Sequence, residues 1–218
     1  MRAAPGAIEH VRFHGGAFQV QTIGKAAPIG ICGSGILDAV AQGLEAGIID
    51  ERGSLVKGHP LVSRTESGPA CLLVPAGRSG HGRDVVFTRS DVNEIQLAKG
   101  AIRAGTELLL REAGIGAASL DNVIVAGAFG TYLDLESAIR VGLLVDVGRE
   151  RYRQVGNAAG RGAEQLLLSR ERRAMADRLA KRVRYVELTV HRSFTDMFAK
   201  SLGFGRGSPR GACAPLAD

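Results

Sequence analysis

The sequence contains no tryptophan, and aromatic side chains make up only 5% of its 218 residues. Proteins that bind single-stranded nucleic acid commonly stack the bases on aromatic side chains, so this composition argues against nucleic-acid binding despite a net charge of +6. No apolar run approaches the roughly 18 to 20 residues that a membrane helix needs, and the N-terminus lacks the apolar segment of a secretory signal. We therefore expect a protein of the cytoplasm that does not associate with a membrane.

Cysteine is scarce as well. The three cysteines, Cys32, Cys71 and Cys213, are odd in number and form no CxxC pair, so neither a disulfide framework nor a zinc site is indicated. The five histidines show no metal-ligand spacing, and we assign them no role. The sequence therefore predicts reduced thiols and no metal ion held by protein side chains.

Basic residues, in contrast, are concentrated in one segment. Between Arg170 and Arg184 there are seven basic residues against two acidic ones, Glu171 and Asp177, on a predicted helix. A charge pattern of this kind is typical of a solvated helix face or of a docking surface for an acidic partner protein.

The spacing of apolar residues predicts an α/β chain in which helices and strands alternate. Alternating or β-branched runs predict strands at 8–13 and 18–23, joined by a glycine turn, and at 72–74, 85–88, 123–126 and 185–188. Helical spacing and capping residues predict helices at 36–47, 90–113 with Ser90 as N-cap, 135–141, 157–169, 170–184 and 193–202. Glycine, proline and serine are frequent in residues 51–84, which we expect to form an irregular insertion, and residues 205–218 are expected to be a disordered tail.

Two glycine-rich turns carry the first functional indication. Gly127, Ala128, Phe129 and Gly130 follow the apolar run at 123–126, and Asn157 opens a second glycine-rich segment as a candidate N-cap. Glycine after a buried strand lets the backbone pass close to a ligand, and the unpaired amides of a helix N-terminus suit anions. The pair indicates a nucleotide-binding lobe, with the alternative that the glycines only permit tight strand-to-helix turns.

The predicted helix at 90–113 is unusually slim in its middle. Its small residues are Ala98, Gly100, Ala101, Ala104 and Gly105. Glycine within a helix costs roughly 0.5 to 1 kcal/mol relative to alanine. We therefore expect a neighbouring backbone or a ligand to approach this helix closely.

Four blocks of sequence, taken together, resemble a known family. They are PIGICGSGILDAVAQ, VFTRSDVNEIQLAKGAIRAG, VIVAGAFGTYLDLESAIRVGLL and VGNAAGRGAEQLLLS. In this order they resemble the C-terminal region of the ATP-dependent reductive activators of corrinoid proteins, which belong to the ASKHA superfamily of acetate and sugar kinases, Hsp70 and actin. The resemblance covers residues 1–204 and implies a ribonuclease-H-like lobe, with a mixed sheet flanked by helices.

The same resemblance implies a site for the adenosine half of ATP, with magnesium as its companion ion. Gly127, Ala128, Phe129 and Gly130 would form the adenosine-binding turn, and the slim helix with Lys99 and Gly100 would pack beside the nucleotide. A loop of Gly33, Ser34 and Gly35 would lie near the phosphate or ribose, with Asp38 one turn into the next helix. Other interpretations stay open: Asp38 and Asp134 could be caps or bridge loops, and Lys99 could be a solvated helix lysine.

Full-length relatives begin with a ferredoxin domain that holds a 2Fe-2S cluster, followed by a first ASKHA lobe. The sequence has neither the cluster-binding cysteine run nor a DxGT-like loop, so we expect a C-terminal piece with weak or absent ATPase activity. In the relatives, ATP drives an electron from the cluster to a cobalt(II) corrinoid protein, the expected partner here; a homodimer is also open. The alternatives are an activator of the 2-hydroxyacyl-CoA dehydratase type, with Cys32 holding a cluster, and a non-enzymatic or vestigial interaction module.

Overall fold

The computed structural model describes residues 1–66, 68–188 and 190–205, apart from the side chains of Ala128 and Phe129. Its strands are β1 (Ala7–His14), β2 (Ala17–Thr22), β3 (Gly30–Ile31), β4 (Val62–Thr65), β5 (Gly68–Val74), β6 (Val85–Thr88), β7 (Val123–Ala126) and β8 (Tyr152–Gly156). Its α-helices are α1 (Gly33–Glu45), α2 (Arg89–Glu112), α3 (Ala128–Tyr132), α4 (Leu135–Arg140), α5 (Ala158–Leu168), α6 (Arg170–Ala180) and α7 (Phe194–Lys200). The expected α/β class is confirmed.

The strands of the described residues form three small sheets. The first has the order β2-β1-β3, in which β1 pairs with β2 antiparallel and with β3 parallel, so it is mixed as expected. The predicted hairpin is confirmed, with Gly15 and Gly16 at φ +60° and +79° in its turn. The second sheet, β4-β5-β6, is antiparallel, and the third pairs β7 with β8 in parallel.

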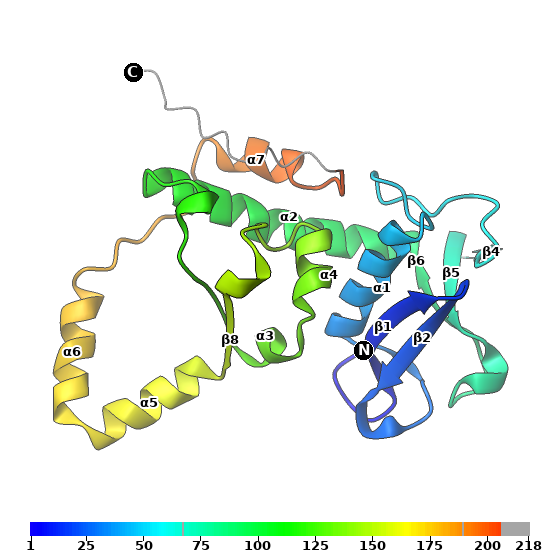
Figure 1. Cartoon of the computed structure of the whole chain (residues 1–218), viewed down its shortest axis with the longest axis horizontal. Coiled ribbons are helices and arrows are strands. Elements are labelled where there is room, and N and C mark those ends of the chain that lie inside the picture. Colours follow the sequence, from blue (N-terminus) through cyan, green and yellow to red (C-terminus); the bar gives the residue numbers. More distant parts are fainter. Residues whose placement is uncertain (67, 189, 206–218) are drawn as a thin grey trace.

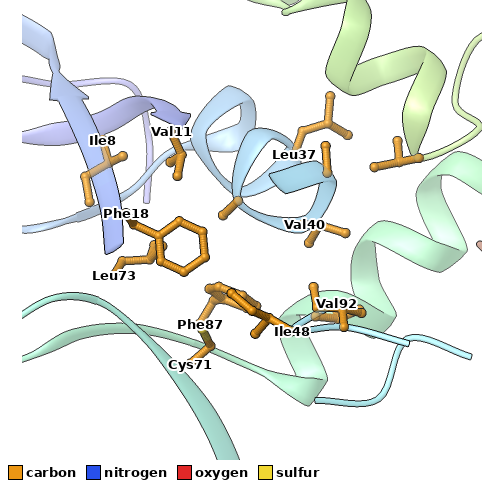
Figure 2. Close-up of a cluster of buried hydrophobic side chains, with 14 of the residues drawn as sticks. Ile8, Val11, Phe18, Leu37, Val40, Ile48, Cys71, Leu73, Phe87 and Val92 are labelled. Carbon is orange, nitrogen blue, oxygen red and sulfur yellow. The ribbon is translucent and has the colours of Figure 1, made fainter. Parts of the chain in front are cut away.

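The first two sheets and α1 share one hydrophobic core. Figure 2 shows apolar side chains of β1, β2 and α1 facing those of β5 and β6, and the rings of Phe18 and Phe87 meet edge to face at 6.3 Å. Cys71 and Leu73 of β5 are buried in this core. The expectation that residues 51–84 are irregular is therefore wrong for residues 62–74, because β4 and β5 form an antiparallel hairpin there that closes the core.

The long helix α2 begins two residues earlier than predicted. Thr88, and not Ser90, is the N-cap: its Oγ1 accepts a hydrogen bond from the amide of Asp91 at 3.3 Å, and its own amide donates to Asp91 Oδ2 at 2.7 Å. This reciprocal pair is a capping box, which satisfies two amide donors at once. Ser90 lies inside the helix.

The slim middle of α2 faces α7, which lies along it in Figure 1. A Cβ atom on Gly100 would lie 3.1 Å from Cδ2 of Leu202, and one on Gly105 would lie 3.2 Å from Cδ1 of Leu188. A neighbour does approach closely, as expected, but it is neither a backbone nor a ligand: side chains of the C-terminal part of the chain pack against these glycines.

The region beyond β7 contains most of the other differences. Helix α3 and strand β8 were not predicted, and the strand expected at 185–188 is wrong, because those residues have no strand pairing and Tyr185 is 80% exposed. Helices α5 and α6 contain no buried residue and extend away from the sheets (Figure 1). The predicted tail lies outside the described residues except for Gly205. None of the described helices is long and apolar enough to cross a membrane.

Candidate functional site

The two glycine-rich turns lie side by side at one edge of the third sheet. Because β7 and β8 are parallel, both strands end at the same edge, which is where open α/β sheets commonly bind ligands. The amide of Gly127 donates to the carbonyl oxygen of Gly156 at 2.7 Å. Gln154 on β8 adds two hydrogen bonds to the segment after the first turn, since its Nε2 donates to the carbonyl oxygens of Gly130 at 2.6 Å and Leu133 at 2.8 Å.

The glycines at this edge are needed for different structural reasons. Gly127 has φ +98° and Gly156 has φ +64°, a backbone region that L side chains rarely adopt. Apart from its chain neighbours, no atom of the described residues lies within 4 Å of a Cβ placed on Gly127, so the described residues leave this position open. A Cβ on Gly130 would instead lie 2.8 Å from Cγ1 of Val125, so Gly130 is required by packing.

Helix α5 begins at the same edge, directly after Gly156. The predicted N-cap is confirmed, since Asn157 Oδ1 accepts from the amide of Gly160 at 2.9 Å. One amide of the first turn is therefore satisfied by the cap. The remaining amides of the first turn give this edge the positive end of an 11-residue helix.

The segment with Gly33, Ser34 and Gly35 is not a loop, which corrects the expectation. These residues form the first turn of α1, and Ser34 and Gly35 are buried. A Cβ on Gly35 would overlap the carbonyl oxygen of Ile8 and lie 2.9 Å from its carbonyl carbon. Gly35 is therefore needed for the close packing of α1 against β1.

A surface cavity of about 520 Å³ lies at the start of α1, lined by Cys32 and Gly33 together with His81, Asp84 and Asp91. None of the residues that line it belongs to the two glycine turns. Cys32 itself is only 4% exposed, with its Sγ 3.4 Å from Ser34 Oγ. Among the described residues, no three His, Cys, Asp or Glu side chains are grouped so that they could hold a metal ion.

Asp38 lies in a buried polar junction between α1 and β1. Its Oδ2 accepts from the amide of Val11 at 3.2 Å and lies 3.1 Å from His10 Nδ1, and the side chain is fully buried. Burial raises the pKa of the Asp38 carboxyl, against the lowering effect of hydrogen bonds from Ser137, His10 and the Val11 amide. Asp38 therefore holds secondary-structure elements together.

Arg12 extends this junction to α4. Its guanidinium donates to Asp134 Oδ2 at 2.7 Å, and Asp134 Oδ1 accepts from the amide of Ser137 at 2.8 Å as N-cap of α4. Burial alone would raise the pKa of Asp134, but the hydrogen bonds from Ser137 and Arg12 lower it overall. The interpretation of Asp134 as a cap is confirmed. Sequence reasoning missed Arg12 and Gln154, although His10 and Arg12 share one face of β1 and Gln154 lies two residues before Gly156 of the second glycine turn.

Lys99 is not a solvated lysine, because it is 3% exposed. Its Nζ donates to the carbonyl oxygen of Gly203 at 2.5 Å and lies 5.2 Å from the ring centroid of Phe204. Burial, with a smaller contribution from Arg103, lowers the pKa of the amine to about 8. Gly100, beside it on α2, packs against Leu202 and Phe198. In this structure, the C-terminal segment therefore packs against both Lys99 and Gly100.

Comparison with known proteins gives consistent matches. The family model for the C-terminal domain of RACo, the ASKHA domain, matches residues 1–208. The corrinoid activation enzyme RamQ of Eubacterium limosum is 37% identical over 214 residues, which are 94% of this chain and 36% of that protein. The Co(II) methylated amine-specific corrinoid protein reductase of Methanosarcina barkeri is 27% identical over 178 residues, covering 81% of this chain and 29% of that protein.

A solved structure agrees with these matches. The reductive activator for corrinoid, iron-sulfur protein superposes with a TM-score of 0.85 at 37% identity, covering 93% of this chain and 33% of that one. The chain thus spans about a third of the length of the relatives it matches.

Proposed function

Since the chain belongs to the family of the C-terminal ASKHA domain of RACo, we propose that it is the C-terminal nucleotide-binding lobe of a reductive activator of corrinoid proteins. The observation that carries the proposal is the edge at which the turns of Gly127 and Gly156 lie side by side, joined by a 2.7 Å hydrogen bond. Backbone amides and open space at the ends of parallel strands suit a nucleotide, which needs close backbone approach rather than a long side chain.

In this proposal the ligand is ATP, and the adenosine half lies against the turn that begins at Gly127. In support of this placement, no atom of a described residue other than the chain neighbours lies within 4 Å of a Cβ placed on Gly127. Magnesium would be held by the phosphates of ATP and by the first lobe of a longer protein, because the described residues offer no grouped ligands for a metal ion. The 2Fe-2S cluster likewise belongs to a ferredoxin domain outside this sequence.

The names of longer relatives support a proposal for the activity of the whole protein. Relatives about three times as long are named as activators or reductases of corrinoid proteins. We propose that a corrinoid protein is the partner, that ATP drives its reduction from cobalt(II) to cobalt(I), and that the reaction takes place in the cytoplasm. Phosphoryl transfer depends on charged groups and metal ions that clamp the phosphates, so the 218 residues alone should show little ATPase activity.

The test is thermal unfolding with and without ATP and magnesium. A ligand that binds only the folded state at 100 times its Kd stabilises it by about 2.7 kcal/mol, which should raise Tm by about 5 to 10 °C for a chain of this size. Gly127→Ala should abolish this shift. Gly114→Ala is the matched control, because Gly114 also has a positive φ, +68°, with no atom near its Cβ position.

Each outcome has a definite meaning. A shift that is lost in Gly127→Ala and kept in Gly114→Ala supports a nucleotide site at the glycine edge. A shift kept in both variants means that ATP binds elsewhere. No shift in the unmodified protein contradicts the nucleotide site and favours a non-enzymatic interaction module.

A further inference from the structure

After α7 ends, the chain stays in contact with α2. Residues 201–205, which we call the strap, run along α2 toward the turn at 50–53. The amide of Phe204 donates to the carbonyl oxygen of Glu51 at 2.8 Å, and Phe204 packs against the main core. The strap therefore joins the end of the described chain to a turn about 150 residues earlier in the sequence.

Two polar side chains of α2 bind successive carbonyl groups of the strap. Gln96 Nε2 donates to Leu202 at 3.0 Å, and Lys99 Nζ donates to Gly203 at 2.5 Å. Gln96 also donates to the carbonyl oxygen of Arg52 at 3.3 Å. Gln96 and Lys99 are both more than nine-tenths buried, so the strap covers the groups that hold it.

Lys99 has few polar partners for a buried ammonium group. Removing an ammonium group from water is unfavourable unless it gains polar partners, and within the described residues the amine gains one main-chain carbonyl, the face of the Phe204 ring and no ion pair. Arg103 adds a like charge nearby. An open strap would return the amine to water, so contacts of the strap oppose hydration of Lys99.

We propose that Gln96 and Lys99 form a two-point latch that holds residues 201–205 closed along α2, and that the closed strap shields the Lys99 amine from other ligands. The latch rests on contacts that are separate from the proposed nucleotide edge. Its failure or success therefore leaves the proposed function unaffected.

Hydrogen exchange of the strap amides tests the first half of the proposal. Lys99→Met keeps the length of the side chain but leaves the Gly203 carbonyl without its donor, and an unsatisfied buried acceptor is unfavourable. We expect exchange in residues 201–205 to become about tenfold faster or more. Lys200→Met is the control, since Lys200 is exposed at the end of α7, adjacent to the strap and outside the latch. Equal exchange in both variants would overturn the latch.

Acetylation of lysines in the full chain tests the second half without depending on how Lys99→Met folds. With N-hydroxysuccinimidyl acetate and mass spectrometry, Lys99 should react at least about tenfold more slowly than Lys200, because a covered amine reacts only when the strap opens. Phe204→Ala removes the ring over the amine and should raise the rate at Lys99 toward that at Lys200. The proposal fails if Lys99 and Lys200 react alike in the unmodified protein, or if Phe204→Ala leaves the Lys99 rate unchanged.

Discussion

Gly35 offers a direct test of why α1 begins with glycines. The sequence resemblance implies that Gly35 lies near the phosphate or ribose of a nucleotide, whereas in the structure Gly35 allows the close contact of α1 with the backbone of Ile8. Gly43 lies two turns later on the same helix, and its Cβ position is 2.8 Å from Cδ1 of Ile49. The same substitution, glycine to alanine, would thus meet a rigid carbonyl at one position and the end of a flexible side chain at the other.

The magnitudes follow from this difference. Alanine gains about 1 kcal/mol of helix propensity over glycine at either position, while overpacking a close-packed core costs about 1 to 3 kcal/mol or more. At Gly35 the backbone of Ile8 cannot rotate away, so we take the upper end of the overpacking cost, about 3 kcal/mol. After the gain in helix propensity, we expect the free energy of unfolding to fall by about 2 kcal/mol. At Gly43 the side chain of Ile49 can shift, and the two effects should cancel to within about 1 kcal/mol.

Urea unfolding separates the two variants. With m near 2 kcal/mol per molar, Gly35→Ala should lower the midpoint by about 1 M at unchanged m, and Gly43→Ala should leave it nearly unchanged. The packing argument is refuted if Gly35→Ala is as stable as the unmodified protein, or if both variants lose the same stability. A stable Gly35→Ala would return the glycine to the interpretation as part of a ligand site.

Three further predictions concern titration and capping. Because the pKa of Asp38 is raised in the folded state, the folded protein binds more protons than the unfolded chain at pH values above the ordinary pKa of an aspartate. The contribution of Asp38 to the free energy of unfolding therefore falls as pH rises through that range. Asp38→Asn should remove this pH dependence from urea midpoints measured at about pH 3 to 6. Because the pKa of Lys99 is lowered to about 8, the unfolded chain binds more protons between about pH 8 and 10.5. Stability of the unmodified protein should therefore rise across that window relative to Lys99→Met, as Tm measured against pH will check. Thr88→Ala should lose about 1 kcal/mol through the broken cap, and Ser90→Ala, inside the helix, should lose a few tenths at most in the same denaturation assay.

The features that the sequence predicted well are decided by a few neighbouring residues. Gly47 ends α1 with φ +70° because a left-handed residue suits a helix C-terminus. Asn157 caps α5 through an amide three residues away. The β1–β2 hairpin closes through Gly15 and Gly16. Each of these depends on local backbone chemistry, which is fully present in the sequence.

The features that it predicted poorly depend on partners far along the chain. The strand β4 has the sequence VSRT, with three of its four residues exposed, and only its pairing with β5 makes it a strand. Residues 185–188 have the β-branched and aromatic composition of a strand, yet no neighbouring strand pairs with them among the described residues. A strand requires a partner for its backbone groups, and composition alone does not supply one.

Helix α2 combines a feature that the sequence predicts with one that it does not. Its glycines correctly predicted that something approaches closely, since a missing side chain has a local cost that only a close neighbour offsets. They could not say whether a ligand or a protein segment approaches, because Gly100 leaves the same space for either. The neighbour of Gly100 is Leu202, about 100 residues later in the sequence. The same segment also supplies the carbonyl oxygen of Gly203, to which the Lys99 amine donates. The shape of a surface is therefore more predictable from sequence than its occupant, and site residues inferred from shape alone need a test of occupancy.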